Sequence, residues 1–419
     1  MKAGYLSQFF SGVAAKTLSA VEADPARSHQ HEFNGVNGLI SVFERAAAKQ
    51  VFPAKFLYLS DDDDPPVFED GTVTWYDARH NHPTRSEHRL YFPTTNVSRC
   101  WAAGDLLVIG KRPGDSVLVV AAQGGSTIAN QVRWLFGVGH AVQLGFFVRE
   151  DLETEQDRIQ FASSLILEQL GIVVETTEET FLDRILEKFG RRFPPTSDFS
   201  AFARTTLPDL TARDDPDRAL MAWMEREEIL FRTLEKHLIA DRLRAGFADD
   251  VDGFLQYSLS VQNRRKSRVG LALENHLEVV FQQNRIRYTR NAATEGKARP
   301  DFLFPGGREY RDPAMDPRLL TMLGVKSTCK DRWRQVLSEA ARIPGKHLLT
   351  LEAAISRDQT NQMRSNGLTL VIPRGLHETY TQGQRTELLD LGTFVALVRD
   401  KDLGLHVDSS EPRPLAPRV

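Results

Sequence analysis

The sequence predicts a multidomain protein, with an N-terminal β-barrel and a C-terminal α/β domain that has a mixed central sheet. At 419 residues the chain exceeds the size at which a single hydrophobic core usually stops growing. Short β-rich runs fill its first part, whereas amphipathic helical patterns alternate with short apolar strands in its last part. We therefore expect domains at residues 1–175 and 218–419, joined by a helical segment and linker at 176–217.

The composition is that of an ordinary globular protein, with 41% hydrophobic residues and a net charge of −3. This charge argues against a histone-like coat but allows local basic patches. No apolar run approaches the ~20 residues that cross a bilayer, and no uninterrupted apolar segment marks a secretory signal. Cys100 and Cys329 are too isolated for a disulfide framework or a zinc site. We expect a cytoplasmic protein that has no membrane partner.

The elements of the first part are short strands and one helix. In "LLVIGKRPGDSVLVV" two apolar runs flank Gly, Pro and Gly-Asp, which predicts a β-hairpin. The helix "STIANQVRWLFGV" covers 126–138. The predicted strands are 54–60, 71–78, 88–95, the hairpin 105–123, and 141–148.

After two further helical patterns, the stretch 191–217 is rich in Pro, Asp and Thr and is the best linker candidate. The amphipathic pattern of 216–247 predicts a long helix that starts near Pro216 or Asp217. The remaining predicted helices are 267–284 and 331–343, and the predicted strands are 301–304, 320–328, 346–351 and 368–373.

Two of these strands place an acid and a lysine at adjacent ends. Pro300 and Asp301 head one strand, and Lys326 lies on the next, 25 residues later. Hydrolysis of a phosphodiester needs a divalent cation and a fixed positive charge, and Mg²⁺ prefers carboxylate, water and phosphate oxygens. The pattern is that of a PD-(D/E)xK nuclease, except that Gly324 stands where the second acid is normally found.

The second carboxylate must then come from another element. Glu339 follows Lys326 by 13 residues on the predicted helix, off its apolar stripe, so it can reach the place that Gly324 leaves empty. Glu274 on the opening helix can supply a further acid. We interpret His276 and Glu278, which lie close by, as solvated helix residues.

Basic residues surround this candidate site. Arginine forks match guanine O6 and N7, and an acid accepts from cytosine N4, so "KDRWR" can read C:G pairs; the alternative is a solvated helical turn. Three cations are unfavourable at a helix N-terminus, which favours an anionic partner. The run "NRRKSR" either contacts phosphate or stays solvated. The residues concerned are Lys330, Asp331, Arg332 and Arg334, then Arg264, Arg265, Lys266 and Arg268.

From about residue 245 onward, the chain resembles the EcoRII-type (type IIE) restriction endonucleases of the PD-(D/E)xK superfamily. The resemblance covers consecutive stretches such as "SVQNRRKSRVG", "TEGKARPDFLFP" and "VKSTCKDRWRQVLSEA". It implies a Mg²⁺-dependent enzyme that cuts both strands at a short C:G-flanked site, CCWGG in the best-known member. The family's catalytic residues fall on Glu274, Asp301, Lys326 and Glu339, with Tyr310 and Lys330 close to the site.

In the first part, "YDARHNHPTRSEHR" is similar to the family's effector-DNA segment, which implies a B3-like barrel that binds a second copy of the site. Arg85, Glu87 and Arg89 alternate and would share one face of a strand, with Arg79 nearby. Such a face can contact bases and phosphates, or it can hold cross-strand ion pairs. The resemblance also implies that this domain covers the catalytic cleft until effector DNA binds.

A near-palindromic site has two scissile strands, so we expect a homodimer formed through the C-terminal domain. Asp301 and Glu339 would hold Mg²⁺, Glu274 would tune the site, and Lys326 would orient the attacking water. Two alternatives remain: a DNA-binding regulator that no longer cuts, and a nuclease that acts on modified DNA.

Overall fold

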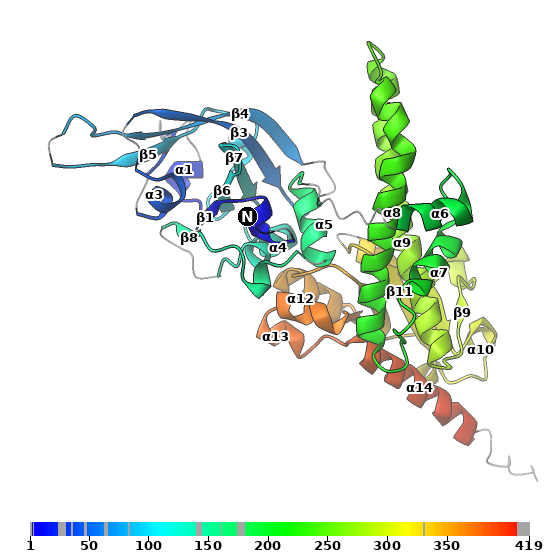
Figure 1. The fold of residues 1–419 in the computed structure, drawn as a ribbon. Helices are drawn as coiled ribbons and strands as arrows, with labels where there is room; N and C mark the ends of the chain where they lie inside the picture. The colour runs from blue at the N-terminus through cyan, green and yellow to red at the C-terminus, as the bar shows by residue number, and fades with distance from the viewer. Residues whose placement is uncertain are drawn as a thin grey trace, which may run out of the picture. The chain divides into compact units, whose positions relative to one another are not determined.

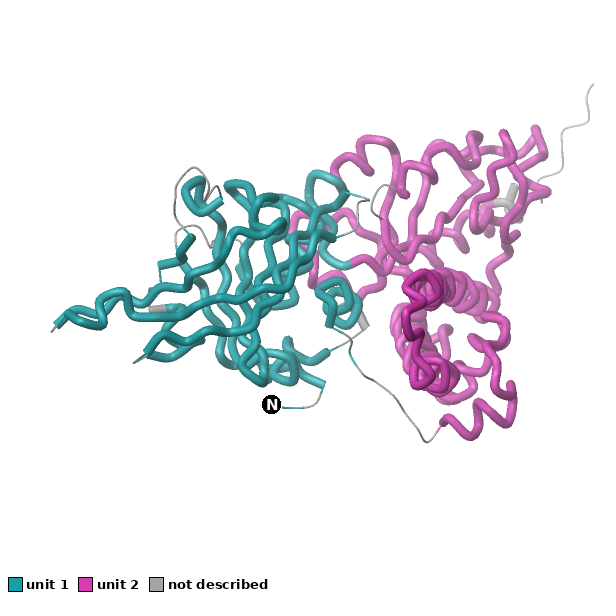
Figure 2. Tube along the Cα trace, turned by 90° about the horizontal axis from the view of Figure 1, so that it is seen from above, with its two compact units in different colours: residues 1–174, 353–359 teal, residues 175–352, 360–419 magenta. Residues whose placement is uncertain are grey.

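The computed structural model of the chain describes residues 2, 4–23, 31–34, 37–45, 48–62, 66–82, 84–139, 145–159, 161–172, 174, 181–329 and 332–408. Their contacts define two compact units (Figure 2). Unit 1 comprises residues 1–174 and 353–359, and unit 2 comprises residues 175–352 and 360–419. Among the described residues, no helix combines the length and the apolar character needed to cross a bilayer.

Unit 1 is built on an eight-stranded sheet of order β2-β5-β4-β3-β7-β6-β1-β8, in which only β3 and β7 pair in parallel. The predicted strands are present, and the predicted hairpin is β6–β7, turning at Gly114 and Asp115 with positive φ. The strands are β1 (Gly12–Thr17), β2 (Glu32–Asn34), β3 (Gln50–Leu59), β4 (Val67–Asp77), β5 (His88–Tyr91), β6 (Leu106–Arg112), β7 (Ser116–Ala122) and β8 (Phe147–Arg149). Residues 141–144 of the last predicted strand lie outside the described part.

The sheet is curved but open (Figure 1), with β2 and β8 at its edges, whereas we predicted a barrel. Both edge strands have three residues, so the ladder ends before the described strands close on themselves. The concave side is filled by aromatic rings: Phe33 stacks on Phe92 with centroids 4.5 Å apart, and Trp75 is fully buried. Helix α3 (Asn37–Phe43) adds Phe43 to this core.

Helix α4 (Thr127–Leu135) begins where predicted, capped by Ser126, whose Oγ accepts from Ala129 N at 3.1 Å. Residues 353–359 pack within this unit. Gln131 Nε2 donates to Ala353 O at 3.1 Å, and Ser356 N donates to the Thr127 hydroxyl at 3.0 Å. A short piece of the C-terminal sequence therefore belongs to unit 1. Helix α5 (Phe161–Gln169) completes the unit.

Unit 2 opens with four helices: α6 (Leu182–Phe189), α7 (Thr196–Thr205), α8 (Pro216–Ala245) and α9 (Val251–Gln283). The predicted long helix is α8, which starts at Pro216 after the cap Asp215. The stretch 191–217, predicted to be a linker, contains α7. Phe199 and Phe202 of α7 are buried in a core shared with α6 and α8, so apolar packing offset the polar composition that indicated a linker.

The sheet of unit 2 is mixed, as predicted, with the order β13-β12-β11-β10-β9. Strands β9, β10 and β11 are antiparallel, whereas β11, β12 and β13 are parallel. The strands are β9 (Thr289–Arg290), β10 (Phe302–Phe304), β11 (Thr321–Lys326), β12 (Lys346–Thr350) and β13 (Leu368–Val371). The helices after β10 are α10 (Gly307–Arg311), α11 (Trp333–Leu337), α12 (Arg357–Ser365), α13 (Gln382–Arg385) and α14 (Leu391–Asp408).

Helix α11 is shorter than the predicted helix 331–343. It ends at Leu337, and Ala340 has a φ of +47°, a left-handed conformation that an α-helix cannot continue through. Glu339 consequently lies in a turn after the helix, and not on the helix where we placed it.

Candidate active site

Asp301 and Lys326 meet at the ends of two neighbouring strands, as their spacing predicted. Asp301 precedes β10, and its Oδ2 accepts hydrogen bonds from Val325 N at 2.6 Å and Lys326 Nζ at 3.1 Å. Their side chains are 13% and 22% exposed, respectively, so solvent reaches the pair from one side. The backbone donor fixes the carboxylate on β11, and the ammonium lies beside it.

Packing explains why the acid of the sequence pattern is absent at Gly324. A Cβ there would lie 2.9 and 3.0 Å from the two γ-carbons of Val336, which is fully buried on α11. Carbon atoms in contact prefer a separation of about 3.5–4.0 Å. The space that an acidic side chain would need at this strand position is therefore filled by the helix.

Glu339 lies in the turn that follows the same helix. Burial raises the pKa of its carboxyl group, and the charge of Asp301 raises it further. Its Oε2 is buried and has no hydrogen-bond partner among the described residues. Lys346 Nζ holds this turn by donating to the carbonyls of Glu339, Ala340 and Ile343, the last two at 3.1 and 3.2 Å.

Glu274, on α9, is the third carboxylate of the cluster. Burial raises the pKa of its carboxyl group and so does Asp301, although Arg290 opposes the shift. Arg290 Nη2 donates to Glu274 Oε2 at 2.7 Å, and its Nη1 donates to Asn275 and Glu278 at 3.0 and 3.1 Å. Glu274 is thus ion-paired, and Glu278 belongs to the same network and is not simply solvated.

Tyr310 supports the site from α10. Its hydroxyl donates to both carboxylate oxygens of Glu295, at 2.7 and 2.5 Å, and accepts from Arg342 N at 3.3 Å. Burial and the bond to Glu295 raise the pKa of Tyr310 to about 12. Glu295 also accepts from Ala341 N at 3.3 Å. Tyr310 and Glu295 therefore hold the turn after Glu339. Among the described residues, no hydrogen bond joins Tyr310 to Asp301, Glu339 or Glu274.

Sequence reasoning missed Glu295, Arg290 and Lys346. The sequence gives little indication of Glu295, because an acid that stands 15 residues before a tyrosine matches no known sequence motif. Lys346 heads an apolar strand, where we had no reason to expect a buried ammonium. Burial lowers the pKa of Lys346.

The cluster fits a hard divalent cation in chemistry. No group of three or more metal-ligating His, Cys, Asp or Glu side chains is preassembled among the described residues. Mg²⁺, however, is commonly held by only one or two carboxylates together with water and substrate phosphate. Such a cation would give a partner to the buried Oε2 of Glu339, which has none among the described residues. It would also reduce the repulsion between the carboxylates of Glu339 and Asp301.

The basic run on α9 divides into buried and exposed members. Arg268 is 8% exposed, lies over the rings of Phe199 and Phe231, and donates to Pro194 O at 3.1 Å. Arg265 pairs with Glu235 at 2.6 Å. We expected both guanidinium groups either to contact phosphate or to be solvated. Instead, they pack against buried acids of α8, which hold them in place.

The other two members lie nearer the surface. Arg264 covers the ring of Phe193 at 4.1 Å, and Lys266 is exposed. His276, which we interpreted as solvated, is fully buried, with Nδ1 2.9 Å from Arg204 Nη1 and Nε2 3.0 Å from Glu227 Oε2. Burial lowers the pKa of His276.

The predicted base-reading segment is only partly described. Lys330 and Asp331 lie outside the described residues. Arg332 is exposed at the start of α11, and Arg334 is exposed over the ring of Trp333 at 4.8 Å. Both guanidinium groups project from the element that follows the strand of Lys326.

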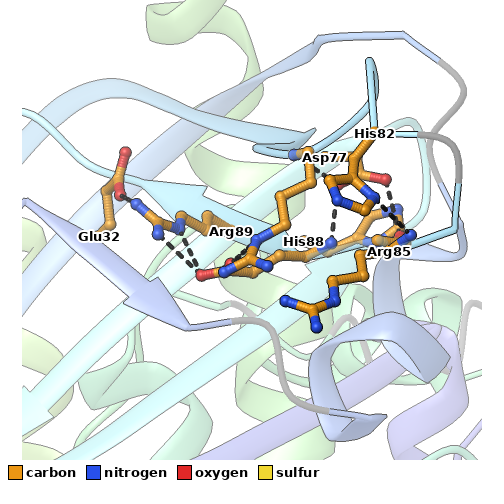
Figure 3. Close-up of polar contacts among 9 residues, drawn as sticks. Glu32, Asp77, His82, Arg85, His88 and Arg89 are labelled. Atoms are coloured by element: carbon orange, nitrogen blue, oxygen red, sulfur yellow. Dashed lines mark hydrogen bonds and ion pairs between the residues drawn. The ribbon is translucent and has the colours of Figure 1, made fainter.

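In unit 1, the predicted effector residues Arg79, Arg85 and Glu87 lie in the β4–β5 connection, and Arg89 lies on β5 (Figure 3). Strand β5 begins at His88, so Arg85 and Glu87 precede the strand on which we placed them. Glu87 bridges Arg79 at 2.6 Å and Arg89 at 2.7 Å. Arg85 is exposed, and Figure 3 draws no dashed line from its guanidinium to the other residues shown.

Further acids orient this segment. Glu32 of β2 accepts from Arg89 Nη1 at 2.7 Å and from the hydroxyl of Tyr76. Asp77 accepts from the backbone N–H of Glu87 and from Ser86, which lower the pKa of Asp77 to about 2. Two backbone N–H groups, those of Thr84 and Arg85, donate to His82 Nδ1.

Comparison with known proteins locates the same part of the chain. The family model described as EcoRII C terminal matches residues 231–395. The type II restriction enzyme EcoRII of Escherichia coli is 41% identical over 223 residues, 53% of this chain and 54% of that enzyme. The chain thus matches about half the length of this curated relative.

Two solved structures are also similar. Metal-depleted Ecl18kI in complex with uncleaved, modified DNA has 19% identity and a TM-score of 0.43, over 56% of this chain and 86% of that chain. A complex of the restriction endonuclease PspGI with substrate DNA has 18% identity and a TM-score of 0.42, over 51% and 94%, respectively. Residues 231–395 thus match the EcoRII C-terminal family model, and the sequence identity to EcoRII supports this similarity.

Proposed function

We propose that this protein is a type II restriction endonuclease, of the IIE class, that makes Mg²⁺-dependent double-strand breaks at a short C:G-flanked site similar to CCWGG. The observation that carries the proposal is the cluster of Asp301, Lys326 and the unpartnered carboxylate of Glu339 inside a domain related to EcoRII. Homodimerisation, with one active centre for each strand, is part of the proposal.

In this proposal Asp301, Glu339 and Glu274 would hold the cation. When bound, the cation polarises the phosphodiester and lowers the pKa of a water molecule. Lys326 orients the attacking water and compensates the charge that develops on the phosphate oxygens. Arg290 positions Glu274, and Tyr310 with Glu295 positions the turn of Glu339.

The N-terminal unit would bind effector DNA through Arg79, Arg85, Glu87 and Arg89, in the manner of a B3-like domain. Within the described part of the chain, Arg79, Glu87 and Arg89 are ion-paired and Arg85 is not. Glu87 can accept from cytosine N4. Autoinhibition by this unit requires that effector DNA bind the open form more tightly than the closed form.

The test is incubation of the purified chain with unmethylated multi-site plasmid and Mg²⁺, followed by sequencing of the fragment ends. We expect discrete ends at a shared motif, abolished in Asp301→Ala and Lys326→Ala. Asp316→Ala is the matched control, because Asp316 is a partly exposed acid of the same unit whose only ion pair among the described residues is with Arg318.

The alternatives give different results. DNA that is bound but left intact, even with added effector duplexes, would indicate a regulator that no longer cuts. Cleavage of methylated plasmid alone would indicate a modification-dependent nuclease.

A further inference from the structure

An exposed apolar stripe follows the first turns of α9. Val251, Leu255 and Leu259 recur at intervals of four residues, which places them on one side of the helix. They are 66%, 50% and 56% exposed, respectively. Figure 1 shows that the joined ends of α8 and α9 extend beyond α6 and α7 within unit 2. Clustered exposed apolar side chains of this kind mark interaction sites.

The stripe is separate from the contacts that hold the two helices together. At the connection between them, Phe247 packs against Phe254 and Tyr257 with centroids 5.6 and 5.5 Å apart. Arg242 covers the ring of Phe247 at 4.2 Å. The α8–α9 hairpin therefore has its own apolar seam, and the stripe is additional apolar surface.

Opposite charges lie symmetrically on either side of Leu259. Asp252 is seven residues before it and Lys266 seven residues after it, and both are exposed. Seven residues are close to two helical turns, so all three side chains share one side of α9. At 1.5 Å per residue the two charges are about 21 Å apart, too far to pair within one helix. Neither one forms an ion pair with another described residue.

This pattern is complementary to itself. We propose that the α9 surface formed by Val251, Asp252, Leu255, Leu259 and Lys266 binds the same surface of a second copy of this chain. A two-fold axis through Leu259 sets the two α9 helices antiparallel. The leucines then pack together, and each Asp252 faces the partner's Lys266. The proposal rests on the homodimer of the proposed function and names the surface that forms it.

The charge pattern favours a second copy over the other occupants. A DNA backbone would be repelled by Asp252 and would not bury leucines, and an anionic membrane would be repelled in the same way. The proposal also reassigns Lys266, which lies beside the stripe, from a phosphate contact to an intermolecular ion pair.

The first test compares the association of full-length variants by sedimentation velocity over a dilution series. Leu259→Arg should weaken self-association by about 30-fold or more, as expected for a central apolar residue of an interface. Leu403→Arg is the matched control, because Leu403 is equally exposed (56%) in the same unit but lies on α14. It should associate like the unmodified chain.

The second test exchanges the charges. Asp252→Lys and Lys266→Asp each place like charges together and should weaken association by about tenfold, whereas the double variant should restore it. Rescue is informative because general destabilisation cannot produce it. Since an acid is favoured in a first helical turn, circular dichroism of each variant checks that α9 remains folded.

Three outcomes contradict the proposal, and they can be told apart. An unmodified chain that stays monomeric throughout the series overturns both this surface and the homodimer. A dimer that survives Leu259→Arg and both charge changes overturns the surface alone. Loss of association without rescue in the double variant overturns the antiparallel pairing. Plasmid cleavage, measured separately, decides the nuclease proposal independently of all three.

Discussion

Replacing Gly324 by alanine tests the idea that packing displaced the acid of the nuclease motif. The new Cβ would lie 2.9 and 3.0 Å from the γ-carbons of Val336, roughly 0.5–1 Å inside the preferred separation of carbon atoms. Val336 is fully buried on α11, so it has little room to move. Overpacking of this kind costs about 1–3 kcal/mol, and we expect Gly324→Ala to lose that much stability in unit 2.

The assay is hydrogen exchange of the full chain, followed in peptides from β11 and α11, because global unfolding of a two-unit chain need not be two-state. Gly383→Ala is the control, since a Cβ at Gly383 on α13 meets nothing within 4 Å. Val336→Ala should relieve the clash, so the double variant should show a favourable coupling of about 1–3 kcal/mol. Gly324→Ala exchanging like the unmodified chain would refute the packing explanation.

Three further predictions concern the lysine that holds the turn of Glu339, a buried histidine of β12, and the acid that pairs with arginines beside β5. Lys346→Met should raise the Mg²⁺ concentration needed for cleavage, because it frees the turn of Glu339. Lys401→Met, which removes an ammonium bound to other backbone and hydroxyl oxygens, should lower the melting temperature without this shift, and equal metal dependence in both would contradict a positioning role. Burial lowers the pKa of His347 from 6.5 to about 4, so the unfolded chain takes up the proton first. About 3 kcal/mol of stability should therefore disappear as the pH falls from 6.5 to 4; denaturation of His347→Leu should lack this loss, and an unchanged pH profile would rule it out. Glu87→Gln should release Arg79, while Arg89 keeps its ion pair with Glu32, and should steepen the salt dependence of DNA binding by about one unit, measured by fluorescence anisotropy; an unaltered slope would show that Arg79 stays unavailable.

The strands of both units could be predicted because their signals are local. The apolar run of β11 and the turn residues between β6 and β7 act within a few positions. The stretch 191–217 was misassigned for the opposite reason: Phe199 and Phe202 form a helix because distant residues of α8 cover them. Residues 353–359 join unit 1 through hydrogen bonds to α4, more than 200 residues away in sequence, and no local pattern indicates this.

The residues of the candidate site also divide into those that local sequence predicts and those that depend on distant contacts. The pairing of Asp301 with Lys326 follows from two adjacent strands, so spacing alone predicted it. Arg268 looked solvated because it lies in a basic run, yet its partners are a backbone carbonyl of 74 residues earlier and two rings. The role of Arg290 could not be predicted from the sequence, because its bond to Glu274 depends on how the fold places β9 beside α9.

Charge balance explains how the displaced acid can still serve a metal site. The cluster holds three carboxylates. Lys326 pairs with Asp301 and Arg290 pairs with Glu274, whereas the ammonium of Lys346 donates to backbone carbonyls of the Glu339 turn. Glu339 is left with a buried oxygen that has no partner among the described residues, and its pKa is raised. A buried carboxylate without compensation is costly, so this turn favours any cation that can approach Asp301 and Glu339 together. Val336 of α11 fills the space at Gly324, so packing excludes an acidic side chain from this strand position. The same helix ends just before Glu339, so the turn after it carries an acid instead. In the proposed site, the departure from the sequence motif is a relocation of the carboxylate, and the cation would bind beside a Glu339 oxygen that has no hydrogen-bond partner among the described residues.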